Sequence, residues 1–195
     1  METANAGNAY DLAKQAAEVV VKKFGGSHDV LAVLGSGWAH AASVLEATNE
    51  ISVTEIPGFI KPSAIGHGGT LKSVKVGNSR VLLLTGRTHL YEGHGVNAVV
   101  HAVRTAWFAG CKTVVLTNAA GCLRQDWGVG ATALISDHIN LTGFSPLTGA
   151  DAPAPLHGRF VDLTDAYSLR LREIAKQVDP TLHEGVYMGY HGPHF

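Results

Sequence analysis

The fold of this chain is constrained most by three short apolar runs of strand length. Each run leads into a loop that contains glycine or other small residues. The runs cover residues 30–34, 80–85 and 113–117. Segments with apolar residues at helical spacing lie between them, at 38–46 and 96–109. Strands that alternate with helices form a sheet covered by helices. The pattern therefore predicts an α/β fold whose sheet is part parallel and part antiparallel.

The rest of the chain adds a hairpin, a long loop and a late helix. The strand-length run 70–76 precedes the tight-turn pair Gly77-Asn78, which predicts a β-hairpin with 80–85. Residues 143–160, rich in Gly and Pro, are expected to form a loop, and long loops in compact domains are more often functional than idle. Thr164 is the expected cap of the late helix. The remaining expected elements are helices over 10–23 and 165–178 and strands over 131–136 and about 184–189.

The charge content of the chain is low for a soluble domain. Charged residues make up 16% of the 195 residues, against roughly 25% on average, while 46% are hydrophobic. This composition excludes a disordered chain, and the length suits one domain over residues 1–195. A net charge of −1 provides no field to hold nucleic acid or an anionic membrane. The low charge also suggests that part of the surface is buried against other subunits.

The N-terminus and the cysteines indicate a cytoplasmic protein. Residues 1–10 are polar and small, unlike a secretory signal, and no apolar run approaches the roughly 18 residues of a membrane span. Cys111 and Cys122 have neither metal-ligand nor redox spacing. We expect both to be buried, reduced thiols.

Each of the three strand-length runs leads into residues suited to a ligand. Gly35-Ser36-Gly37 can turn backbone N–H groups and the Ser36 hydroxyl toward an anion, although a tight turn alone explains it equally well. Arg87 and His89 alternate after the second run and so project to one side as a phosphate clamp, with Tyr91 at the same parity. The small residues from Thr117 to Gly121 leave room for a flat ligand, and close packing of a crossover connection is the alternative.

Ligands of open α/β sheets bind at the carboxyl ends of strands, so these three loops are expected to converge on one pocket. His67, flanked by glycines, lies in a further loop that allows a close backbone approach. For any one of these loop histidines, a surface or structural role is the main alternative. The sequence lacks the carboxylate–histidine cluster that would predict a metal site. Ser36 does not match the G-x-S-x-G pattern of a serine hydrolase.

Taken in order, seven motifs resemble the trimeric purine nucleoside phosphorylases, most closely their bacterial members. The resemblance runs from about residue 8 to residue 195. It implies a three-layer αβα fold around a central mixed sheet. Methylthioadenosine phosphorylases are the nearest alternative, but they usually differ where this chain has TNAAG. The motifs are GSGW, GHGG, GRTHLYEGH, LTNAAG, ISDHINLTGFSPL, FVDLTDAYS and GVYMGYHGPHF.

The resemblance implies reversible phosphorolysis of purine nucleosides, with inorganic phosphate as co-substrate and neither cofactor nor metal. It assigns catalysis to Ser36, Arg87 and His89, and implies a homotrimer in which Phe160 closes a neighbouring subunit's sugar pocket. The implied phosphate-binding residues are Ser36, His67, Arg87, Thr88, His89 and Ala119. The implied nucleoside-binding residues are Tyr91, Ala119, Ala120, Gly121, Phe160, Tyr187 and Phe195.

The family pattern continues beyond the point where this sequence stops. A glutamate that contacts the purine, an asparagine at the base and a histidine at the sugar hydroxyl would follow Phe195. We therefore expect a C-terminal part to be missing, either because the chain is a fragment or because it is a shortened protein. A chain without those groups is expected to bind phosphate but to lose nearly all phosphorolysis. A phosphate- or nucleoside-binding fragment without activity is thus the alternative to an enzyme.

Overall fold

The structure is a computed structural model that describes residues 6–38, 40–61, 69–149, 151–156 and 158–193. The chain divides into two compact units, which are described separately. The larger unit consists of Met1–Ala119 and Pro146–His157, and the smaller unit of Ala120–Ser145 and Gly158–Phe195. A single domain over the whole chain stays a prediction.

Helices and strands alternate along most of the chain, as the apolar runs predict. In chain order the elements are α1 (Ala6–Phe24), β1 (Val30–Leu34), α2 (Ala41–Val44), β2 (Ala47–Ser52), η1 (Val53–Glu55), β3 (Thr70–Val76), β4 (Ser79–Thr85), η2 (Leu90–Glu92), α3 (Val96–Val99), α4 (His101–Phe108), β5 (Thr113–Leu116), β6 (Ala133–Asn140), α5 (Leu169–Val178) and β7 (His183–Gly189), where η marks a 3-10 helix.

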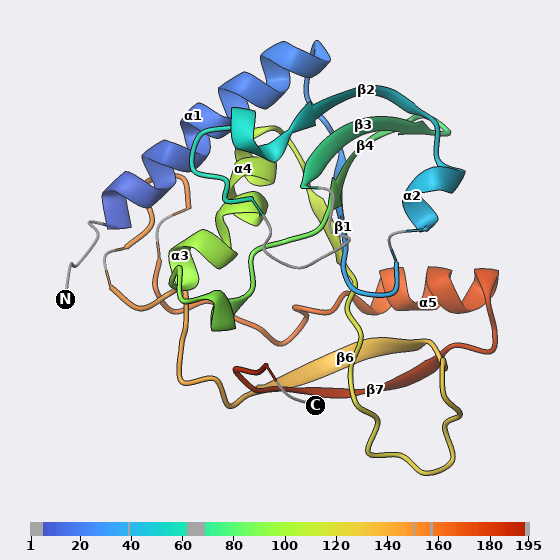
Figure 1. Cartoon of the computed structure of the whole chain (residues 1–195). Helices are drawn as coiled ribbons and strands as arrows, with labels where there is room; N and C mark the ends of the chain where they lie inside the picture. The colour runs from blue at the N-terminus through green and yellow to red at the C-terminus, as the bar shows by residue number, and fades with distance from the viewer. Residues whose placement is uncertain (1–5, 39, 62–68, 150, 157, 194–195) are drawn as a thin grey trace. The chain divides into compact units, whose positions relative to one another are not determined.

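The larger unit is built on a five-stranded sheet in the order β2-β3-β4-β1-β5 (Figure 1). β1 pairs in parallel with both β4 and β5, whereas β2, β3 and β4 are antiparallel neighbours. The hairpin between β3 and β4 turns at Gly77, whose φ of 57° is left-handed and favours glycine. The expected mixed sheet and hairpin are confirmed.

Helices cover both faces of this sheet because alternate strand residues point to opposite sides. On one face Leu31, Val33 and their neighbours on β3 and β4 form a buried core with α1 and α4. On the other face Leu34 and Leu83 pack with residues of α2. Figure 1 shows α1 and α4 on one side of the sheet and α2 on the other. The three-layer αβα arrangement is confirmed.

The smaller unit contains a separate two-stranded sheet and one helix. β6 and β7 pair in parallel, and α5 packs against β6. Glu184 on β7 forms ion pairs with Arg172 and Lys176, which lie one turn apart on α5. These ion pairs fasten the helix to the strand.

The structure differs from the expected elements in several ways, and the helix expected over 38–46 is confined to α2, while the strand expected over 131–136 is displaced to β6. β2 was not expected, because its sequence ATNEIS buries only Ile51. The expected helix over 96–109 is divided at Val100, whose ψ of 0° lies outside the helical range. The late helix begins at Leu169, so Thr164 is not its cap, and the Thr164 hydroxyl instead donates to Asp162 Oδ1 at 2.6 Å.

The two cysteines differ in environment. Cys111 is buried, as expected, and burial raises the pKa of its thiol to about 11. Cys122 is exposed, so the expectation that both thiols are buried is wrong for this residue. Among the described residues, no helix combines the length and the hydropathy needed to cross a membrane.

A buried histidine joins the start of the sheet to the end of α1. His28 is 2% exposed, its Nε2 lies 2.9 Å from the Ser73 hydroxyl, and its ring meets the edge of Phe24. The Arg80 guanidinium donates to the carbonyls of Phe24 and Ser27 beside it. Burial, together with the charge of Arg80, lowers the pKa of His28 from 6.5 to about 4.

The depressed pKa of His28 predicts that the protein loses stability as the pH falls from 6.5 to about 4. In this window the unfolded state takes up the proton more readily than the folded state, so acid favours unfolding. The free energy of unfolding is expected to fall by on the order of 2–3 kcal/mol over this window. His28→Gln should lack this pH-dependent fall, because glutamine does not titrate. Urea unfolding between pH 7 and pH 4 measures this, with the exposed His40→Gln as control. Equal pH slopes for wild type and His28→Gln would contradict the assignment.

Candidate anion site

The ends of β1, β4 and β5 meet at one edge of the sheet. Leu34 pairs with Thr85, and Val33 with Leu116, so the segments after these strands are neighbours. Backbone hydrogen bonds continue the pairing beyond the strands, from Gly86 N to the Leu34 carbonyl and from Thr117 N to the Val33 carbonyl, both at 3.1 Å. The predicted meeting of the three strand ends is therefore confirmed within the larger unit, whereas a single ligand pocket formed by the three loops stays a prediction.

Arg87 lies directly against the backbone at Gly35, in the loop that follows β1. Its Nη1 atom donates to the Thr117 carbonyl at 3.1 Å. A Cβ atom placed on Gly35 would lie 1.8 Å from the same Nη1 and 2.2 Å from the Thr117 carbonyl oxygen. Only glycine leaves room for the guanidinium at this point. Arg87 is thus held beside the turn that carries Ser36.

The side chain of Thr117 connects the same loops. Its Oγ1 accepts a hydrogen bond from Gly35 N and donates one to the Val33 carbonyl, each at 2.9 Å. The turn continues with a bond from Trp38 N to the Gly35 carbonyl. The conformation of the GSG turn is therefore set by a residue on the neighbouring strand end.

His89 is oriented by a nearly buried carboxylate. Its Nδ1 donates to Glu92 Oε1 at 3.1 Å, and the Glu92 side chain is 5% exposed. The ring also stacks on Tyr91, with centroids 4.9 Å apart. Because the carboxylate fixes the Nδ1 side of the ring, Nε2 points the other way. His94 Nε2 lies 4.0 Å from the second oxygen of Glu92.

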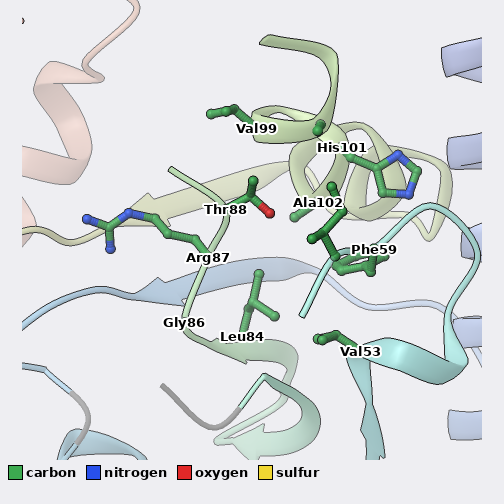
Figure 2. Close-up of a pocket in the computed structure, with 11 residues that line it drawn as sticks. Val53, Phe59, Leu84, Gly86, Arg87, Thr88, Val99, His101 and Ala102 are labelled. Carbon is green, nitrogen blue, oxygen red and sulfur yellow. The ribbon is translucent and has the colours of Figure 1, made fainter. Parts of the chain in front are cut away.

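A small apolar pocket backs the segment that carries Arg87 and Thr88. It holds about 30 Å³, enough for about two water molecules, and is far smaller than a typical ligand cavity. Figure 2 shows the Arg87 guanidinium pointing away from the apolar side chains of Leu84 and Phe59. Buried His101 donates from Nε2 to the Pro57 carbonyl at 2.9 Å, and burial lowers the pKa of its ring. The pocket supports the loop and does not itself fit a purine.

The other expected phosphate-binding groups lie at the same edge where the structure describes them. Ser36 and Ala119 are exposed, and Thr88 is half-buried. His67 lies outside the described residues. The phosphate-binding role of all these residues stays a prediction.

Most expected nucleoside-binding residues belong to the smaller unit, whereas the anion site belongs to the larger one. Tyr91 is exposed in the larger unit, and Phe195 lies outside the described residues. In the smaller unit Phe160 is 98% exposed, and Tyr187 is half-buried on β7. Ala120 and Gly121 begin that unit. Contact of these residues with a nucleoside stays a prediction.

Two residues of the site were not assigned a role from the sequence. Glu92 stands three residues after His89, a spacing that brings side chains together on a helical turn, and this was a usable signal. Thr117 gave no such signal, because the partners of its side chain are more than 80 residues away. Within the described part of the chain, no group of three metal-ligating side chains occurs.

Comparison with known proteins identifies the family. A family model of the phosphorylase superfamily matches residues 29–195. The chain belongs to this superfamily. Its relatives include purine nucleoside phosphorylases from Mycobacterium tuberculosis and from Cellulomonas sp. The first is 54% identical, with 95% of this chain aligned to 67% of the relative. The second is 50% identical, with 94% aligned to 65%. The chain thus spans about two thirds of their length.

Solved structures of the same superfamily show the same fold. A purine nucleoside phosphorylase from Schistosoma mansoni in complex with acetate has a TM-score of 0.88 and 30% identity, covering 100% of this chain and 74% of its own. Isoform 2 from the same organism, in complex with cytosine and ribose-1-phosphate, has a TM-score of 0.84 at 29% identity, covering 98% and 69%. The nucleoside phosphorylase-like fold implied by the motifs is confirmed.

Gly35→Ala is expected to disrupt the site because its new methyl group would overlap Arg87 and the Thr117 carbonyl. Relieving the overlap costs on the order of 1–3 kcal/mol of stability. It also moves the guanidinium, so phosphate affinity should fall at least about tenfold. Thermal unfolding and calorimetric titration with phosphate measure the two effects. Gly128→Ala, which meets nothing within 4 Å, is the matched control. An unchanged phosphate affinity in Gly35→Ala would contradict this packing.

Proposed function

We propose that the protein is a purine nucleoside phosphorylase, a pentosyltransferase that reversibly converts a purine nucleoside and phosphate into the free base and a pentose 1-phosphate. The observation that carries the proposal is the Arg87 guanidinium seated beside the GSG turn at the meeting point of three strand ends. Membership of the phosphorylase superfamily and relatives of that name at 50–54% identity support it.

In this proposal the anion site holds the attacking phosphate. Arg87 supplies a charged, planar donor, Ser36 a hydroxyl and His89 the ring nitrogen on the side away from Glu92. Charge-assisted hydrogen bonds of this kind are about twice as strong as neutral ones. Because the donors sit on interlocked strand ends, phosphate would be positioned with little reorganisation.

The reaction exchanges one bond at the sugar carbon for another. The C1′–N bond to the purine breaks as positive charge develops on the sugar ring, and a phosphate oxygen then forms the new bond to C1′. A phosphate dianion held below C1′ stabilises that charge before it attacks. The electron pair of the broken bond leaves with the purine, which takes up a proton, and the hydrogen phosphate dianion gives up one proton as it becomes the pentose 1-phosphate, so the reaction balances.

The test uses the protein in the length that its gene encodes, with inosine and phosphate as substrates and hypoxanthine as the measured product. We expect phosphate-dependent release of hypoxanthine, and little turnover of methylthioadenosine. Arg87→Ala should weaken phosphate binding by on the order of 2 kcal/mol, roughly 30-fold. Arg170→Ala, an exposed arginine on α5, is the control. Absence of phosphorolysis, or equal phosphate binding by Arg87→Ala, would refute the proposal.

We further propose a homotrimer in which Phe160 reaches a neighbouring subunit's sugar pocket. Phe160 is 98% exposed, and Phe144, Val161 and Leu163 of the same unit are each more than half exposed. Apolar side chains left in water in this number mark interaction surfaces. A location in the cytoplasm and the lack of a cofactor stay predictions.

Phe160→Ala is expected to raise the KM for nucleoside about tenfold or more while leaving the KM for phosphate unchanged, because an aromatic wall is lost from the sugar pocket only. Steady-state kinetics with each substrate varied separately measures the two constants. The control is Val178→Ala, which removes an apolar side chain that is 82% exposed on α5. Phe108 is unsuitable as a control because its side chain packs against the core. A fully active monomer in sedimentation at micromolar concentration would contradict the trimer.

A further inference from the structure

We infer that Thr117 is the positioning residue of the anion site, a role that rests on the function proposed above. Thr117 stands directly after β5, between the loop with Ser36 and the side chain of Arg87. Its side chain bonds one of these partners and its backbone bonds the other. One residue therefore fixes the relative placement of two expected phosphate-binding groups that lie 51 positions apart in the sequence.

The hydroxyl of Thr117 fixes the turn. It accepts from Gly35 N and donates to the Val33 carbonyl, so both bonds go to backbone groups at the end of β1. A hydroxyl can do both at once, whereas a methyl group can do neither. Losing it would leave a backbone N–H and a carbonyl without this partner, which favours a different turn conformation. Ser36, the next residue, would move with that turn.

The carbonyl of Thr117 seats the guanidinium. Arg87 Nη1 donates to it at 3.1 Å, in the space that Gly35 leaves free. The three residues are therefore interlocked, because Gly35 leaves the space for the Arg87 guanidinium, Arg87 Nη1 donates to the Thr117 carbonyl, and the Thr117 hydroxyl accepts from Gly35 N. Removing one contact of such a cycle shifts the other two. Thr117 is therefore expected to affect anion binding through the positions of Ser36 and Arg87, and not only through the volume of its own side chain.

The experiment compares Thr117→Val, which keeps the shape but removes the hydroxyl, with Thr117→Ser, which keeps the hydroxyl. In Thr117→Val the amide hydrogen of Gly35 should exchange faster with solvent, and inorganic phosphate should bind roughly tenfold more weakly. Thr117→Ser should stay within about twofold of wild type in both measurements. Thr117→Ala replaces the valine variant if the latter does not fold.

Thr48→Val is the matched control, because the Thr48 hydroxyl also donates to a backbone carbonyl, that of Ser73 at 2.9 Å, but lies on the distant edge strand β2. It should lower stability without changing phosphate affinity. In a Ser36→Ala background, Thr117→Val should cause a smaller fold-change than in wild type, because the two residues act through one turn.

The two readouts separate the possible failures. If wild type does not bind phosphate, the proposed function falls, and the Gly35 amide exchange still decides whether the Thr117 hydroxyl holds the turn. If wild type binds phosphate but Thr117→Val binds it equally well, the positioning role is overturned. The same holds if Thr117→Ser is as weak as Thr117→Val, or if Thr48→Val weakens phosphate binding to the same extent.

Discussion

The parallel pairing of β1 with β4 and with β5 is the constraint on which the anion site depends. Parallel strands end at the same edge, so the chain segments that follow them are brought together without any contact between their side chains. The register follows from the alternation on β1, where Leu31 and Val33 face one core and Leu34 faces the other. A slip by one residue would exchange the two faces. The apolar pattern of one five-residue strand thus determines where Gly35, Gly86 and Thr117 lie.

Much of this architecture could be predicted from the sequence because its signals are local. The run 30–34 and the hairpin around Gly77-Asn78 carry their own patterns, and both were confirmed. β2 could not be predicted in the same way, because its polar sequence becomes a strand only by pairing with β3. Helical spacing alone also did not locate the break at Val100 or the start of α5 at Leu169.

The candidate site likewise combines features that could be predicted from the sequence with contacts that could not. The three loops could be predicted to converge because each follows an apolar strand, and Arg87 could be chosen by its chemistry. The contact of Thr117 with Gly35 could not be predicted, since it spans 82 positions, whereas the three-residue spacing of His89 and Glu92 was a usable signal that was not used. The nucleoside-binding residues illustrate the limit: Phe160 and Tyr187 belong to a separate unit, so their part in the site rests on the family and on the proposed function.

The central claim is that the joined ends of β1, β4 and β5 form a phosphate site, and a crystal structure of the protein grown with inorganic phosphate tests it most directly. The account predicts a phosphate ion with oxygens about 2.7–3.2 Å from the Arg87 guanidinium and from Ser36. The Thr117 hydroxyl should still hold Gly35 N in that structure. An empty site at saturating phosphate, or an ion bound only elsewhere on the protein, would contradict the account.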